Sequence, residues 1–244
     1  MEEILGLLIP VSFALMLVVE HFCAAKPLPR VRFWLLKGIV FFSFTGAVNA
    51  VLPALIASTL AGHTLFDLRG LATLPGAVLG ALVGDFFGYW LHRAMHRWHW
   101  LWRWTHQMHH SAERMDLAGM TYTHPFDTLL AFGLTGLAVA LLGLSPDAAA
   151  LAGFLGYAAA VVQHMNIRTP SWIGRVVMRP EAHGLHHERG IHAYNYASFP
   201  LWDIAFGTFR HVRSFPEQYG FWPGASAKLG AMLIGRDVAD PERA

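Results

Sequence analysis

Residues 38–62 form an apolar stretch without a charged side chain, and this stretch constrains the fold more than any other feature of the chain. A helix rises about 1.5 Å per residue, so a run of this length can cross a hydrocarbon core about 30 Å thick. Pro53 lies within the run and predicts a kink. Charged residues make up only 14% of the chain, against about 25% in soluble domains. The chain is therefore predicted to be an integral membrane protein.

Further apolar runs predict a fold with four to five membrane-spanning or hairpin helices in one domain, residues 1–244. The first run follows Met-Glu-Glu and lacks the positive charge that precedes a secretory signal, so it is interpreted as a retained membrane helix. No stretch alternates polar and apolar residues for long, so the fold class is all-α. The predicted membrane helices cover residues 4–23, 38–62 and 71–91 and a hairpin at 128–163, and a helical cap comprises residues 92–127 and 164–244.

The distribution of basic residues predicts the orientation in the membrane. The segment 26–37 contains four Lys or Arg residues and no acid, so it is expected on the cytoplasmic side. The chain then leaves through 38–62 and returns through 71–91, which brings His92 to the cytoplasmic face. The hairpin returns His164 to the same face. Three histidine-containing segments are therefore predicted to meet on one side of the membrane.

Histidine is the unusual residue of this chain, with 15 copies against a single cysteine. In "HRAMH" two histidines are four residues apart, and such a pair shares one helix face and can bind one ion. "HQMHH" at 106–110 and "HGLHH" at 183–187 each end in an adjacent pair, whose rings point in different directions, and this geometry favours two ions over one. Imidazole suits Zn, Cu, Fe and Ni. The candidate ligands are His92, His96, His106, His109, His110, His164, His183, His186 and His187, with His124 as a further candidate.

Asp85 is an acid inside an apolar run, seven residues before His92 and on the same helix face. An acid in a membrane span needs a function, and this one is expected to bind a metal or to accept a hydrogen bond from a ligand ring. The remaining histidines fall outside the motifs and are interpreted as structural, with His63 on the opposite side of the membrane; they are His21, His63, His99, His192 and His211.

The ordered motifs resemble the fatty acid hydroxylase / sterol desaturase superfamily over roughly half of the chain. The matching segments are "DFFGYWLHRAMH", "LWRWTHQMHHS", "THPFD", "QHMNIRTP", "RPEAHGLHH" and "NYASFPLWDIAFGTF". The resemblance implies a membrane-bound diiron oxygenase, in which two iron ions held by the motif histidines use O₂ to hydroxylate or desaturate a C–H bond of a lipid. It also implies that Asn195 supports the ligand rings from outside the metal shell.

Two departures from the family pattern indicate a bacterial-type branch, and hence a bacterial inner membrane. His192 is an additional histidine, and Ala197 stands where glycine often follows the Asn-Tyr pair. No dinucleotide fingerprint or cysteine cluster for electron transfer is present, so a separate reductase, ferredoxin or cytochrome-type donor is expected. A net charge of +2 gives no reason to expect nucleic acid as a partner.

Two alternatives remain open at this level. The same histidines could hold zinc in a membrane hydrolase, which would need neither O₂ nor a reductant. They could also bind metal or haem without catalysis. A transporter would place its ligands near the middle of the bilayer, whereas these histidines are predicted beyond the helix ends. The sequence does not identify the substrate or the position oxidised.

Overall fold

The computed structural model describes residues 2–242, and within them the chain is helical, with isolated β-bridges and no β-strand. The predicted all-α fold class is confirmed. Five long helices form a bundle: α1 (Glu2–Cys23), α2 (Trp34–Thr59), α3 (Thr73–Arg97), α7 (Pro125–Leu141) and α8 (Pro146–His164).

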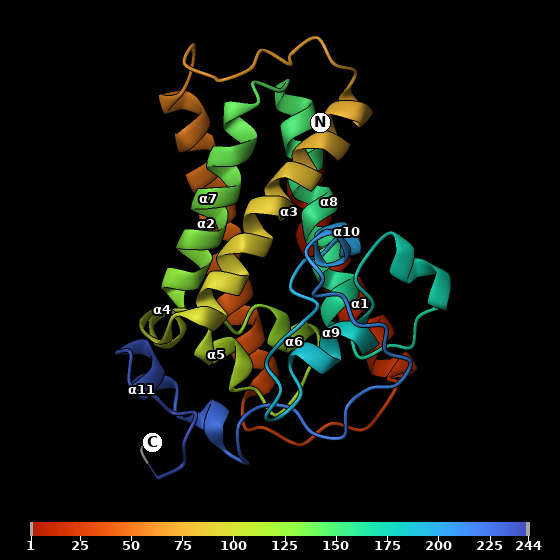
Figure 1. The fold of residues 1–244 in the computed structure, drawn as a ribbon, viewed down its shortest axis with the longest axis vertical. Helices are drawn as coiled ribbons and strands as arrows, with labels where there is room; N and C mark the ends of the chain where they lie inside the picture. Colours follow the sequence, from red (N-terminus) through yellow and green to blue (C-terminus); the bar gives the residue numbers. More distant parts are fainter. Residues whose placement is uncertain (1, 243–244) are drawn as a thin grey trace.

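Short helical segments follow α3 and α8 and build the cap at one end of the bundle (Figure 1). Those after α3 are α4 (His99–Trp104), α5 (Gln107–His110) and α6 (Leu117–Met120). Those after α8 are η1 (Ser171–Arg175), α9 (Pro180–His186), α10 (Pro200–Ala205), η2 (Ala225–Ala227) and α11 (Leu229–Leu233).

Three of the long helices are apolar and long enough to cross a membrane: Ile4–Cys23, Trp34–Thr59 and Thr73–Arg97. Helix α7 has 17 residues and α8 has 19, which correspond to about 25 and 28 Å. Whether this pair crosses completely stays a prediction. Helix α3 continues as one helix to Arg97, so His92 and His96 lie on its last turns, beyond residue 91, where the membrane helix is predicted to end.

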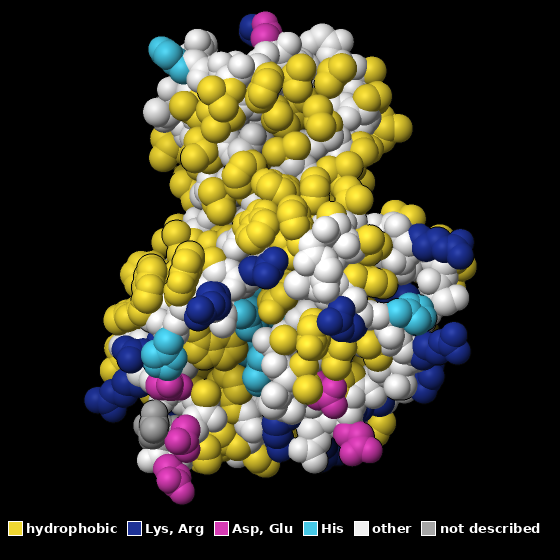
Figure 2. Space-filling view, viewed as in Figure 1, with side chains coloured by type: hydrophobic (Ala, Val, Ile, Leu, Met, Phe, Trp, Pro, Cys, Tyr) yellow, Lys and Arg dark blue, Asp and Glu magenta, His cyan; other side chains and the backbone are white. Residues whose placement is uncertain are grey.

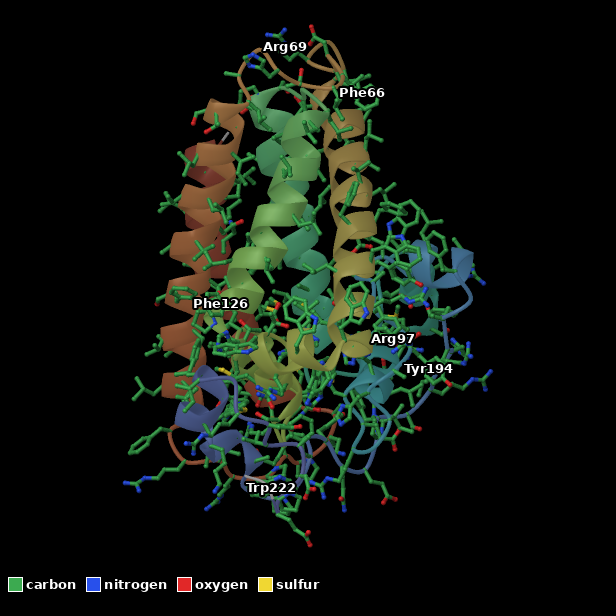
Figure 3. All side chains as sticks on the ribbon, turned by 60° about the vertical axis from the view of Figure 1, so that its left-hand side comes forward. Phe66, Arg69, Arg97, Phe126, Tyr194 and Trp222 are labelled. Atoms are coloured by element: carbon green, nitrogen blue, oxygen red, sulfur yellow. The ribbon has the colours of Figure 1, made fainter. Side chains whose placement is uncertain are left out.

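The two ends of the bundle differ in composition. The α2–α3 and α7–α8 connections meet at the end that carries Phe66 and Arg69, and the cap occupies the other end (Figures 1 and 3). Apolar side chains dominate the visible surface of the upper half, whereas Lys and Arg surround the cap (Figure 2). His63 belongs to the α2–α3 connection, which lies at the end away from the cap. The positive-inside rule rests on this kind of asymmetry, and the cytoplasmic side of the cap stays a prediction.

Small residues let α3 approach α8 closely. Gly76, Gly80 and Gly84 follow one another at four-residue intervals and are all buried. A Cβ atom on Gly80 would lie 2.9 Å from Leu144 Cδ1 and 3.0 Å from Ala152 Cβ, so a side chain there would push these neighbours aside. Close approach of small residues is a common means of packing membrane helices, because lipid tails provide no hydrophobic drive between helices. This contact fixes the position of the two helices whose lower ends carry His92, His96 and His164.

Candidate metal centre

Nine histidines gather at the junction between the bundle and the cap and form two groups. Within each group, the candidate ligand atoms all lie within 4.8 Å of one another. The groups adjoin, since the His110 and His187 rings stack at 4.2 Å between centroids. We call them the five-histidine group and the four-histidine group. The first contains His92, His96, His106, His110 and His186, and the second contains His109, His164, His183 and His187.

The HxxHH motifs divide their histidines between the groups, as the adjacent pairs predicted. In 106–110 the first and last histidines enter the five-histidine group and His109 enters the other. In 183–187 the division is reversed, and His186 alone enters the five-histidine group. Residues four apart share a helix face, whereas adjacent residues point in different directions, so each short helix serves both groups. A break at Thr105, between α4 and α5, turns the first motif toward the bundle.

The outer nitrogens of three rings in the five-histidine group are fixed by acceptors. His92 Nδ1 donates to the Tyr196 carbonyl at 2.7 Å, and His186 Nδ1 donates to the Tyr194 carbonyl at 2.8 Å. His106 Nδ1 donates to the buried Asp127 carboxylate at 2.7 Å. Since these acceptors cannot donate, each ring carries its proton on Nδ1 and leaves a lone pair on Nε2. This arrangement of the outer nitrogen is usual for metal-binding histidine.

The loop that supplies these carbonyls has an uncommon backbone. Tyr194 and Asn195 have φ values of 69° and 48°, a region that residues other than glycine rarely occupy. Carbonyls of three successive residues meet ligand rings, because Asn195 offers its own to His183 Nδ1 at 3.2 Å. The Asn195 side chain holds the loop by donating to Ala182 and Arg210 carbonyls and accepting from the Arg210 N–H. The loop thus adopts an unfavourable backbone conformation in which its carbonyls face three ligand rings.

The inner nitrogens of the five-histidine group fit a metal ion. All five Nε2 atoms are buried without a hydrogen-bond partner. A buried polar atom without a partner costs about 1–3 kcal/mol, so five at one point are difficult to explain as a purely structural core. Convergent imidazole lone pairs are the donor set of a transition-metal ion, which would satisfy all of them together.

The four-histidine group has contacts of the length expected between ligands. His164 Nε2 lies 3.2 Å from both His109 Nε2 and His183 Nε2, and His187 Nε2 lies 3.2 Å from His183 Nε2. Two nitrogens each about 2.0–2.1 Å from one ion are about 3.4 Å apart at a tetrahedral angle. A small cavity of about 10 Å³ borders this group beside Arg114 and Asp116, enough for about one water.

Burial favours the protonation state that metal binding requires in five of the rings. Burial, with repulsion from neighbouring imidazoles, lowers the pKa of the cap histidines well below the ordinary value; this applies to His109, His110, His183, His186 and His187. A neutral imidazole is the form that coordinates a cation.

The structure places two of the candidate residues away from the ligand rings. His124 belongs to neither group: its Nδ1 accepts from the Phe126 N–H at the start of α7, and its ring faces the Leu233 carbonyl. Residues that precede a proline at a helix start are commonly caps, and His124 serves that role. Asp85 contacts no ligand ring, because its carboxylate accepts from the N–H groups of Ser198 and Phe199. Asp85 affects the ligands indirectly, because it holds the backbone two residues after Tyr196, whose carbonyl accepts from His92.

Sequence reasoning also missed two residues that touch ligand rings. Asp127 stands in the quoted "THPFD" segment, three residues from the histidine that was chosen instead. His192 was interpreted as structural, yet its Nδ1 lies 3.0 Å from His110 Nδ1. Burial lowers the pKa of His192 to about 4, so this ring is neutral and can accept from His110. Its signal was present in the sequence, as an additional histidine close to the second HxxHH motif.

The fold and the site define a helical bundle of membrane type in which nine histidines converge at one end, in two groups that offer the donor set of a metal site. The model of the fatty acid hydroxylase family matches residues 77–208, which is more than half of the chain. The chain belongs to this family. The match begins within α3 and ends just after α10, so it includes all nine histidines. No curated protein and no solved structure matches the chain.

Proposed function

We propose that this protein is a non-haem diiron oxygenase that uses O₂ and external electrons to hydroxylate or desaturate a C–H bond of a lipid. The proposal rests on one observation above all: nine imidazoles converge in two adjoining groups, and five of their Nε2 atoms are buried without partners. Family membership supports the reaction type. Two iron ions bound here would supply the O₂ activation that protein side chains cannot provide.

The residues of the chain would bind the ions, orient the ligand rings and exclude bulk water. The ligand rings are fixed through their outer nitrogens by Tyr194, Tyr196 and Asp127, so they meet an ion without reorganisation. The groups lie at the end of membrane helices, where an apolar substrate can arrive from the bilayer. Burial of the site keeps bulk water from a reactive centre.

The reaction needs partners from outside the chain. Hydroxylation of a C–H bond by O₂ consumes two electrons and two protons and releases water, so we expect a separate reductase, ferredoxin or cytochrome-type donor. The basic 26–37 segment lies at the cap end, which favours a cytoplasmic site in a bacterial inner membrane. The substrate is a fatty acyl, sterol, isoprenoid or related lipid.

The test combines metal analysis with lipid analysis. Protein purified without oxygen should contain about two iron ions per chain. Membranes that contain the protein, supplied with O₂ and a reductant, should produce an oxidised lipid that membranes with His109→Ala or His186→Ala lack. The His63→Ala variant is the matched control, because His63 is exposed at the opposite end, and it should behave as the wild type. Zinc in place of iron, with turnover that needs neither O₂ nor reductant, would favour the hydrolase and refute the proposal.

A further inference from the structure

Helix α10 presents apolar side chains outward, although it belongs to the part of the chain expected in the aqueous cap. Leu201 is 47% exposed, Ile204 is 59% exposed and Phe206, just after the helix, is 40% exposed. The neighbouring surface of α3 is of the same kind, with Phe87 37% and Trp90 41% exposed. The two elements therefore form one continuous apolar surface, and α3 is a candidate membrane span.

The depth of α10 follows from its contacts with α3. The Trp202 indole N–H donates to the Leu82 carbonyl at 3.1 Å, and the Phe86 ring packs against Trp202 at 4.9 Å. Leu82 lies about four turns before Arg97, or about 22 Å along the helix axis. The ribbon of α10 accordingly lies beside the middle of α3, above the level of the labelled Arg97 and Tyr194 (Figures 1 and 3).

Basic side chains mark the level below α10. Arg93 places its guanidinium over the rings of Tyr89 and Trp90, and Arg97 is exposed one turn further on. Arg210 lies over the Tyr194 ring, just beyond the apolar segment. Aromatic and basic residues together are typical of the headgroup level of a bilayer. By this criterion α10 lies on the hydrocarbon side of the boundary.

The backbone N–H groups on both sides of α10 are satisfied within the protein, as entry into lipid requires. Asp85 accepts from the N–H groups of Ser198 and Phe199, and Asp203 accepts from those of Tyr196 and Ala197. After the helix, the N–H groups of residues 206–209 find carbonyls of residues 202–204. An exposed loop in water would not need two carboxylates to satisfy four successive N–H groups. This gives Asp85 a definite role in the fold.

We propose that residues 199–207 form a re-entrant wedge immersed in the lipid leaflet on the histidine side, with acyl chains as its partner. The wedge starts in the cap, rises along α3 to the level of Leu82 and returns to the cap at Arg210. It is joined to the five-histidine group, since Tyr196 precedes it by one turn and accepts from His92. The lipid leaflet would thus contact the protein close to Tyr196, whose carbonyl orients the His92 ring. The inference concerns membrane depth and does not depend on the bound metal or the reaction.

The test uses one fluorescent label at a time on the full chain in phosphatidylcholine vesicles. Cys23 is the single cysteine, so Cys23→Ser gives a background without thiols. Ile204→Cys is labelled with an environment-sensitive dye, and Leu201→Cys provides a second position. Val18→Cys on α1 is the lipid-facing reference, and Ile191→Cys, an exposed isoleucine of the cap, is the matched aqueous control.

Vesicles with brominated acyl chains should quench the label at Ile204 as strongly as the label at Val18, and should spare the label at Ile191. Aqueous iodide should give the opposite order. Iodide quenching at Ile204 without quenching by bromolipid would overturn the proposal, because it would place α10 in water. Protection from both quenchers, with energy transfer between labelled copies, would also overturn it, since a second copy of the chain would then cover the surface.

Discussion

The change Asn195→Ala tests whether the strained loop orients the ligand rings. The Asn195 side chain is fully buried and makes three hydrogen bonds that tie residues 182, 195 and 210 together. Each bond contributes about 0.5–1.5 kcal/mol, so their loss costs about 3 kcal/mol. Alanine in the left-handed region costs about 1 kcal/mol more. The total of about 4 kcal/mol is a large part of the stability of an ordinary domain.

For a chain of this size, 1 kcal/mol shifts Tm by about 2–4 °C, so the Tm of the metal-free variant should fall on the order of 10 °C. The three carbonyls at 194–196 would lose their fixed positions, and metal affinity should fall about 10–100-fold, as when other supports of ligand rings are removed. The assays are thermal unfolding in detergent and a competition titration against a chelator.

The matched control is Asn49→Ala, the same change at a half-buried position on α2, a helix that carries none of the nine histidines. It should leave metal affinity unchanged and Tm within a few degrees of the wild type. If Asn195→Ala retained wild-type metal affinity, the carbonyls would not orient the rings. The account of the loop given above would then be wrong, even if Tm fell.

Three further changes test the support of the ligands. Asp127→Ala should lower metal affinity about 10–100-fold, whereas Asp127→Asn, which retains an acceptor oxygen, should change it little in the same titration. His164→Ala should remove about one of the two ions in metal analysis, and His124→Ala should remove none, because His124 caps a helix. Gly80→Val should lower the free energy of unfolding by about 1–3 kcal/mol through overpacking against α8, and it should reduce the metal content. Gly46→Val, which has open space around it, should fold and bind metal as the wild type does. Equal behaviour of the two variants would refute the packing argument.

The fold and the gathering of the nine histidines could be predicted because both depend on the type and spacing of residues, which the sequence shows directly. Apolar runs mark the helices, and the spacing of imidazoles marks shared faces. The end of α3 could not be predicted from hydropathy, because the helix continues beyond its apolar part through His92 to Arg97 without a residue that stops a helix. Hydropathy identifies the part of a helix that lies in lipid and says little about the part that continues beyond it.

The supports of the ligands were harder to predict, for a physical reason. A carbonyl oxygen is present at every residue, so nothing in the letters at 194–196 shows that three of them face imidazoles. In "THPFD" both His124 and Asp127 had suitable chemistry, and only the fold decides which one faces the site. The re-entrant course of residues 199–207 is equally hidden, because a segment of that length is too short to resemble a membrane helix.

The division of the two HxxHH motifs explains why the centre is built from this pattern rather than from isolated histidines. Each motif gives a pair four residues apart to one group and the histidine between them in the helical turn to the other, with the roles exchanged between α5 and α9. Neither group can therefore be assembled or displaced without the other, since a rotation of either short helix moves ligands of both. Because α5 follows α3 and α9 follows α8 in the chain, the glycine contact between α3 and α8 helps to set the distance between the motifs. The packing of the bundle would thus determine the separation of two ions bound in the two groups. The carbonyls and carboxylates that accept from the outer ring nitrogens would keep each ring oriented toward its ion.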